Sequence, residues 1–178
     1  MAHITTVNNS NDSWDNTSAG LIAVGVFEDK SFTPMAEAIN ELSNGSLSEG
    51  IDLGDVKGKT GESHYFYVSG KRILLLGLGK KDKFGSDAVR LVAGKVSRTA
   101  IRKKIDSVAM ECFCENCEYC QSCGEGLVLG SYQFLNYKTE DVNKTGIYKG
   151  EILPFPFILA PSGKRNKVVL ENVKKGEI

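Results

Sequence analysis

The sequence lacks a long apolar run, an excess of charge and a leader-like N-terminus. None of its apolar runs approaches the roughly 20 residues that a membrane-spanning helix needs, and no basic stretch followed by an apolar run opens the chain. Lys plus Arg and Asp plus Glu number 22 each, so the net charge is zero. A neutral chain has no general attraction for nucleic acid or anionic membranes. These absences predict a cytoplasmic protein without a membrane or nucleic-acid partner.

Residues typical of catalysis are also scarce. The 178 residues include two histidines, His3 and His64, and neither lies beside a nucleophile motif. Carboxylates are scattered, and no two are placed as an acid and base pair. We therefore assign no catalytic, cofactor-binding or metal-binding residue from the sequence, and we interpret His64 as structural.

Five cysteines gather within twelve positions: Cys112, Cys114, Cys117, Cys120 and Cys123. An odd, clustered set does not suit a disulfide framework and indicates reduced thiols. Their three successive Cys-x-x-Cys spacings suggest zinc or an iron–sulfur cluster. On a helix, however, Cys114 and Cys123 would lie roughly 13 Å apart, too far to share one ion with bonds of about 2.3 Å. We favour a helix whose thiols pack as small hydrophobic groups, with a metal site as the alternative.

The chain is organised around an apolar run, Ile73 to Leu78, that shows no polar alternation. Such a run is typical of a strand buried on both faces. Gly77 and Gly79 end it, and in open α/β sheets ligands usually lie at this end of a strand. The run lacks the third glycine of the dinucleotide fingerprint, and Lys81 replaces the Ser or Thr of a P-loop. We interpret it as a tight turn before a solvated Lys-rich stretch, with phosphate binding as the alternative.

Local patterns predict further elements around this strand. The predicted strands and loops are a strand at 3–7, a polar loop at 8–18, a strand at 21–27, a hairpin through Ser69–Gly70, a strand at 108–113, an edge strand or irregular wrap at 152–161, and a strand at 167–173. Two predicted helices have a buried stripe: one runs from Thr33–Pro34 to Gly45 and buries Met35, Ala38, Ile39 and Leu42, and one is capped by Ser86 and buries Leu91, Val92, Val96, Ala100 and Ile101. A third helix is predicted at 115–131, with Gly124, Gly126 and Gly130 against a neighbour. The alternation of strands and helices predicts an α/β fold with a mostly parallel sheet.

A group of basic residues lies near the end of the predicted helix that begins at Ser86: Arg98, Arg102, Lys103 and Lys104. We interpret this group as a solvated helix end, with phosphate contact as the alternative.

Four stretches occur in the order and spacing of one family. They are GVFED at 25–29, GKTGE at 58–62, RILLLGLGKK at 72–81 and EGLVLGSYQF at 125–134. Together they resemble the N-terminal domain of the leucine aminopeptidases, also called cytosol aminopeptidases, over about residues 21–138. The resemblance implies a macro-domain-like three-layer α/β/α sandwich with a mixed, mostly parallel sheet.

The resemblance also implies a cytosolic parent enzyme, commonly a hexamer, that removes N-terminal residues from peptides. In that family two divalent metals (zinc, manganese or magnesium) lie in a separate C-terminal catalytic domain. The hallmark Asn-Thr-Asp-Ala-Glu-Gly-Arg of that domain is not among the 178 residues. No active-site residue can be carried over, so we expect no metal cofactor and no activity in this chain alone.

These inferences divide the chain into a mobile N-terminal segment (1–18), a leucine-aminopeptidase N-terminal-like domain (19–150) and a divergent C-terminal segment (151–178), with the catalytic domain absent. We expect a non-catalytic domain for assembly or regulation. Its partners would be a catalytic domain or homologous subunits, with residues 154–159, which include Phe155 and Phe157, as a docking segment. The alternatives are a stand-alone macro-like module that binds an ADP-ribose-type phosphate and a nucleic-acid-binding domain.

Overall fold

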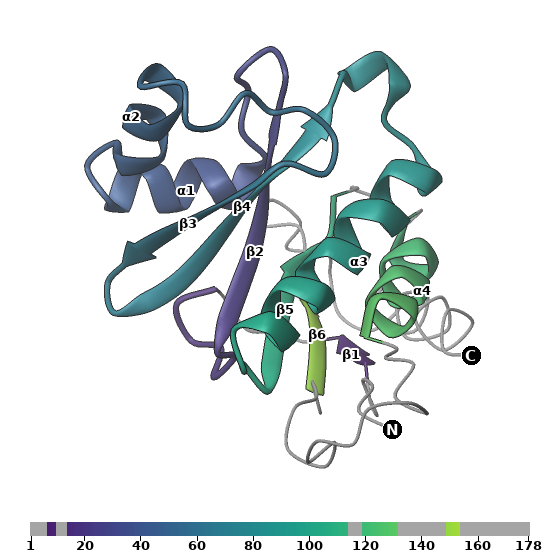
Figure 1. The fold of residues 1–178 in the computed structure, drawn as a ribbon. Helices are drawn as coiled ribbons and strands as arrows, with labels where there is room; N and C mark the ends of the chain where they lie inside the picture. Colours follow the sequence, from purple (N-terminus) through teal and green to yellow (C-terminus); the bar gives the residue numbers. More distant parts are fainter. Residues whose placement is uncertain (1–6, 10–13, 114–118, 132–148, 154–178) are drawn as a thin grey trace, which may run out of the picture.

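A computed structural model describes residues 7–9, 14–113, 119–131 and 149–153 (Figure 1). The elements in chain order are β1 (Val7–Asn9), β2 (Leu21–Phe27), α1 (Pro34–Leu42), α2 (Ser46–Asp52), β3 (Ser63–Val68), β4 (Lys71–Gly79), the 3-10 helix η1 (Lys81–Lys83), α3 (Ser86–Arg102), β5 (Ser107–Glu111), α4 (Cys120–Ser131) and β6 (Lys149–Leu153). Among these described residues, no helix is both long and apolar enough to cross a membrane.

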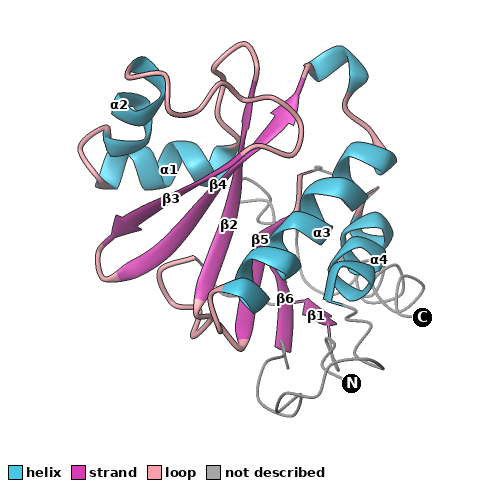
Figure 2. Cartoon of the chain, viewed as in Figure 1, coloured by secondary structure: helices cyan, strands magenta, loops and turns pink. Residues whose placement is uncertain are grey.

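The strands form one sheet in the order β1-β6-β5-β2-β4-β3. All neighbours are parallel except β3 and β4, which form the antiparallel hairpin. Helices α1 and α2 cover one face of the sheet, and α3 and α4 cover the other (Figure 2). The predicted three-layer α/β/α sandwich with a mixed, mostly parallel sheet is confirmed.

Strand β4 contributes to both cores, as its unbroken apolar run predicts. Leu74, Leu76 and Leu78 point into the core beneath α3 and α4. Ile73 and Leu75 point into the core beneath α1 and α2. The side chains of a strand alternate between the two faces of a sheet, so only a continuous apolar run can fill two cores at once.

The glycines of α4 let it pack closely on α3, as predicted. A Cβ at Gly130 would lie 2.4 Å from the Cα of Gly94, and one at Gly126 would lie 2.5 Å from the carbonyl oxygen of Arg90. Any larger residue at these two positions would push the helices apart. Among the described residues α4 begins at Cys120, with Tyr119 in a turn before it. The predicted first residues of this helix, 115–118, lie outside the described residues.

Two predicted helix stripes need correction. In α1 the buried residues are Met35, Ala36 and Ile39, whereas Leu42 is 66% exposed. In α3, Leu91 is 48% exposed, although Val92, Val96 and Ala100 are buried as predicted. Both leucines satisfy helical spacing, but the neighbouring layers do not extend over them.

The two ends of the described chain also differ from expectation. Val7–Asn9 forms β1, and Trp14 is buried, inside the stretch 1–18 that we expected to be mobile. Ile152 and Leu153 belong to β6, which lies between β1 and β5 and not at an edge. The prolines of the predicted wrap follow this strand and, like the docking segment 154–159 and the predicted strand 167–173, lie outside the described residues.

Candidate functional site

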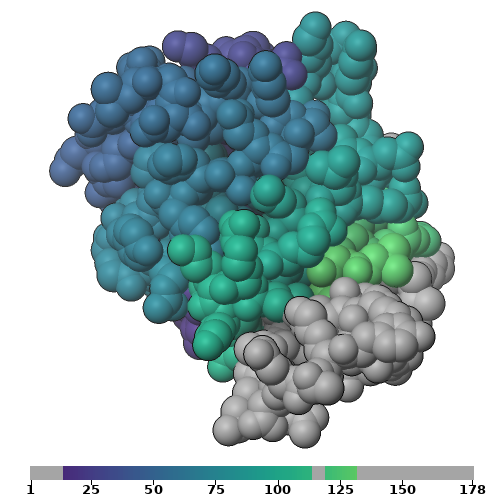
Figure 3. Space-filling view, in the orientation of Figure 1, coloured from purple at the N-terminus to yellow at the C-terminus, as the bar shows by residue number. Residues whose placement is uncertain are grey.

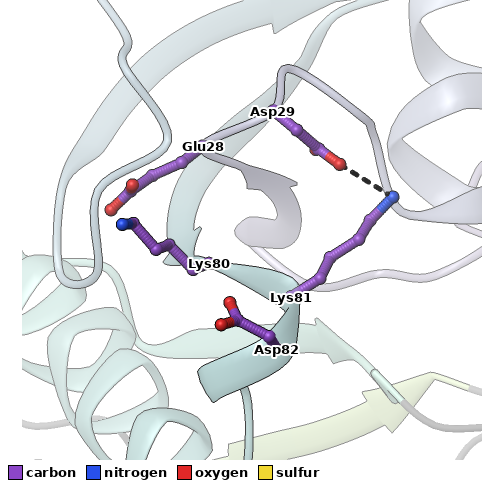
Figure 4. Close-up of a pocket in the computed structure, with 5 residues that line it drawn as sticks. All are labelled: Glu28, Asp29, Lys80, Lys81 and Asp82. Carbon is purple, nitrogen blue, oxygen red and sulfur yellow. Dashed lines mark ion pairs between the residues drawn. The ribbon is translucent and has the colours of Figure 1, made fainter.

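The carboxyl ends of β2 and β4 meet at one edge of the sheet, where parallel strands place their following loops together. A shallow hollow of about 410 Å³ lies there, lined by Glu28, Asp29, Lys80, Lys81 and Asp82 (Figure 4). It includes the turn after β4 at which the sequence analysis placed a possible phosphate site.

The charged groups of the hollow largely neutralise one another. Lys81 Nζ lies 3.1 Å from Asp29 Oδ2 and 5.4 Å from the centre of the Phe27 ring. The pKa of Asp29 is lowered to about 2, first by the Ser31 hydroxyl, then by the Ser31 N–H, and then by Lys81. Glu28 and Lys80 point toward each other (Figure 4). A phosphate here would meet three carboxylates and two ammonium groups, one of them already paired, so the lining does not favour an anion.

The two glycines of the turn serve packing within the chain. A Cβ at Gly77 would lie 2.0 Å from the carbonyl oxygen of Lys59. Gly79 has a φ of +82° and donates its N–H to the Gly58 carbonyl at 2.8 Å. The close backbone approach that these glycines permit is therefore made by residues 58–60 of the same chain.

A buried carboxyl group lies at the same edge, at the end of β5. Glu111 is fully buried. Its Oε1 accepts the Met35 N–H at 3.0 Å, and its Oε2 lies 2.5 Å from the Thr33 hydroxyl oxygen. Thr33 was predicted to cap α1 with its hydroxyl, and this is wrong: its side chain makes no capping bond. The carboxyl of Glu111, 76 residues away along the chain, accepts a helix N–H in its place.

The surroundings of Thr33 favour a neutral Glu111. The Thr33 hydroxyl oxygen accepts the Gly25 N–H at 3.1 Å and also lies 3.0 Å from the Gly25 carbonyl oxygen. A hydroxyl has one proton, which an ionised Glu111 would draw away from Gly25. With a proton on Glu111, both acceptors are satisfied. Burial raises the pKa of Glu111 to about 7, although the hydrogen bonds from Thr33 and Met35 lower it.

Glu111 also fills the position at which α1 would attract an external anion, because the first turn of a helix presents its N–H groups and the positive end of its dipole. Glu111 was not among the residues that we predicted from the sequence. The signal that could have identified it is a lone carboxylate within the apolar stretch 108–113. A charged residue at such a position requires a buried partner.

The three described cysteines belong to the core beneath α3 and α4. Cys112, Cys120 and Cys123 are buried there, and the sulfurs of Cys112 and Cys120 lie 3.3 Å apart. Cys114 and Cys117 fall outside the description. Within the part that is described, no group of three or more His, Cys, Asp or Glu side chains is arranged to hold a metal ion.

His64, the described histidine, does not line the hollow. His64 lies on β3, where its ring packs 5.2 Å from that of Phe66. His3 is not among the described residues.

Comparison with known proteins identifies relatives over most of the chain. The family model described as "Cytosol aminopeptidase family, N-terminal domain" matches residues 23–141. A probable cytosol aminopeptidase of Alkaliphilus metalliredigens is 30% identical over 139 residues, which are 72% of this chain and 28% of that protein. The chain thus spans less than a third of the length of this relative.

Solved structures share the fold at low sequence identity. A mutant tomato leucine aminopeptidase superposes with a TM-score of 0.77 at 19% identity, over 98% of this chain and 36% of that one. An Oceanobacillus iheyensis macrodomain superposes with a TM-score of 0.58 at 10% identity, over 95% of this chain and 89% of that one. Both similarities concern the arrangement of the α/β/α layers.

Proposed function

Because the chain belongs to the cytosol aminopeptidase family and corresponds to its N-terminal domain, we propose that it acts as a non-catalytic domain in the assembly or regulation of a metal-dependent aminopeptidase. The whole enzyme would remove N-terminal residues from peptides in the cytoplasm. Its two divalent metals would lie in a separate catalytic domain. The partners of the chain would be that domain or homologous subunits, in a hexamer as the family resemblance implies.

One observation carries the proposal: at the edge of the sheet where ligands bind in open α/β folds, the polar groups are engaged with one another. Asp29 is held by Ser31 and Lys81. Glu111 is buried against α1. A two-metal hydrolytic site needs several convergent carboxylates that are open to the ions and to water. Asp29 and Glu111 instead hold a loop and a helix in place.

The proposal is tested by two measurements on leucine 4-nitroanilide hydrolysis. The purified chain, with added Mn²⁺ or Zn²⁺, is expected to show no turnover above the rate in buffer. A chimera that joins this chain to the catalytic portion of the Alkaliphilus metalliredigens relative is expected to assemble and to hydrolyse the substrate. Metal-dependent turnover that copurifies with the chain alone would overturn the non-catalytic role, and a folded chimera that neither assembles nor works would overturn the assembly role.

The shared macrodomain fold raises the alternative of an ADP-ribose-type ligand. The site geometry does not favour it, because the diphosphate would meet the carboxylates of Glu28, Asp29 and Asp82 in the hollow and find the α1 N-terminus occupied by Glu111. We expect millimolar ADP-ribose to leave the thermal midpoint of the chain unchanged.

A further inference from the structure

Strand β3 forms one edge of the sheet and has an unusual composition for that position. Its sequence, SHYFYV, contains no Lys, Arg, Asp, Glu or Pro. Edge strands are normally protected by charged side chains, proline, bulges or a covering element, because their unpaired N–H and C=O groups form a template for another strand. Tyr67, near the end of β3, is 77% exposed.

The pairing with β4 shows which backbone groups of β3 face outward. Just before the strand, Glu62 accepts the Gly77 N–H at 2.9 Å, so this pair is of the hydrogen-bonded type. In an antiparallel ladder the hydrogen-bonded pairs recur at every second residue. His64, Phe66 and Val68 therefore bond to β4, and Ser63, Tyr65 and Tyr67 direct their N–H and C=O groups away from the sheet.

These outward groups have no backbone hydrogen-bond partner elsewhere in the described part of the chain. The edge thus presents three N–H and three C=O groups at regular spacing. That pattern is what a further β-strand needs in order to pair.

A basic cluster, which we define as Arg72, Arg102 and Lys103, lies on the same side of the sheet as Tyr65 and Tyr67. Arg72 is the cross-strand neighbour of Tyr67. Lys103 Nζ lies 5.4 Å from the centre of the Tyr65 ring. Arg102 and Arg72 both lie close enough to lower the pKa of Tyr65, which burial raises. The end of α3 and the β3–β4 hairpin adjoin on one face of the molecule (Figure 3).

All three side chains of the basic cluster are exposed. The ion pairs of the described residues involve Lys30, Lys81 and Arg90 as cations, and none includes a member of the cluster. The positive charge beside the edge is therefore available to a partner.

From this combination we propose that β3 binds an extended peptide segment with acidic residues at alternate positions, which adds to the sheet as a further strand. Backbone pairing with Ser63, Tyr65 and Tyr67 would supply binding that is independent of sequence. The basic cluster would favour a segment with acidic side chains. A second copy of β3 is the less suitable occupant, because two-fold pairing would bring two basic clusters together.

The alternation of side chains along β3 indicates which positions of the bound peptide should be acidic and which apolar. Its residues opposite Ser63, Tyr65 and Tyr67 would point to the α3 side of the sheet, since directly paired residues share a face. Acidic side chains there would approach the basic cluster. Its intervening residues would lie beside His64 and Phe66 on the other face, where an apolar side chain fits. The expected ligand alternates acidic and apolar residues over about five positions.

The test uses the full 178-residue chain and a fluorescein-labelled peptide, Ser-Glu-Val-Glu-Val-Glu-Ser, in a fluorescence anisotropy titration. The first matched pair of variants is Tyr67→Pro and Tyr67→Thr. Proline removes the outward N–H and leaves the ladder to β4 intact, because that N–H does not face β4. Threonine also removes the ring but keeps the N–H. We expect Tyr67→Pro to bind about tenfold more weakly than Tyr67→Thr.

The second comparison examines charge. The double variant Arg102→Glu with Lys103→Glu is expected to weaken binding of the acidic peptide at least tenfold and to favour a peptide with Lys in place of Glu. Thermal melts confirm that each variant is folded, and a variant that does not fold is replaced by Arg72→Gln. Absence of saturable binding at 1 mM chain would overturn the proposal, as would equal affinities of the proline and threonine variants. Tighter binding of a DNA duplex than of the peptide, insensitive to Tyr67→Pro, would assign the basic cluster to nucleic acid and overturn it as well.

Discussion

Replacing Glu111 with glutamine should remove a pH dependence that the fold imposes on its own stability. The amide keeps the shape of the neutral carboxyl group. Its oxygen can accept the Met35 N–H, and its NH₂ group can donate to the Thr33 hydroxyl, which is then able to donate to Gly25. Glu111→Gln therefore imitates the protonated side chain at every pH.

The magnitude follows from the pKa of Glu111, which is about 7 in the fold against an ordinary value of 4.5. Because the folded state holds the proton more tightly, the contribution of this group to the free energy of unfolding is greatest below pH 4.5. It decreases as the pH rises through 7 and is constant above that. The full difference is about 3 kcal/mol, of which about 2.5 kcal/mol falls between pH 5 and pH 8.

The assay is urea denaturation of the wild type and of Glu111→Gln at pH 5, 6, 7 and 8. Subtracting the two free energies of unfolding at each pH cancels the titration of the other groups. We expect the variant to gain about 2–3 kcal/mol relative to the wild type from pH 5 to pH 8. Glu111→Ala serves as the control. It leaves the Met35 N–H without its acceptor and should be less stable than Glu111→Gln by about 1–3 kcal/mol at every pH.

A difference between wild type and Glu111→Gln that stays constant across this pH range would refute the reasoning. It would mean that Glu111 has the same pKa in the folded and unfolded chain. The hydrogen bonds from Thr33 and Met35 would then fully offset the cost of burying the ionised carboxylate. A wild type that gains stability relative to the variant as the pH rises would refute it more strongly, because the ionised form would then be the preferred partner of Thr33.

Two further predictions concern the turn after β4 and the cysteines. Gly77→Ala should lower the free energy of unfolding by more than about 2 kcal/mol in denaturant titrations, because its Cβ would meet backbone at 2.0 Å. Gly85→Ala has open space for the Cβ but changes the N-cap of α3, so it should cost no more than about 1 kcal/mol. Equal effects of the two changes would contradict the packing role of Gly77. Elemental analysis of protein purified without chelator should find no stoichiometric zinc or iron, because Cys112, Cys120 and Cys123 pack in an apolar core. A zinc content close to one per chain, with loss of both the zinc and the fold when a chelator is added, would contradict this prediction.

The sequence alone determined the elements whose signal is local. The unbroken apolar run of β4 predicted a strand that fills two cores, and Ser69–Gly70 predicted the hairpin. The small residues of α4 predicted a close helix contact, which Gly126 and Gly130 make. In these cases a property of a few consecutive residues, such as side-chain volume or alternation, is sufficient to define the environment.

Only the tertiary structure decided the features that join distant segments. The α1 cap comes from Glu111 on β5 and not from the adjacent Thr33 hydroxyl. Strand β6 takes an interior position in the sheet although prolines follow it. Helix α2, seven residues long, carries too little periodic signal to be predicted. The outward groups of β3 and their basic neighbours likewise depend on which strand lies at the edge and on where α3 ends. Hydrogen bonds and charges act between groups that the fold brings together, so their partners follow from strand order and layer packing, which local sequence patterns do not encode.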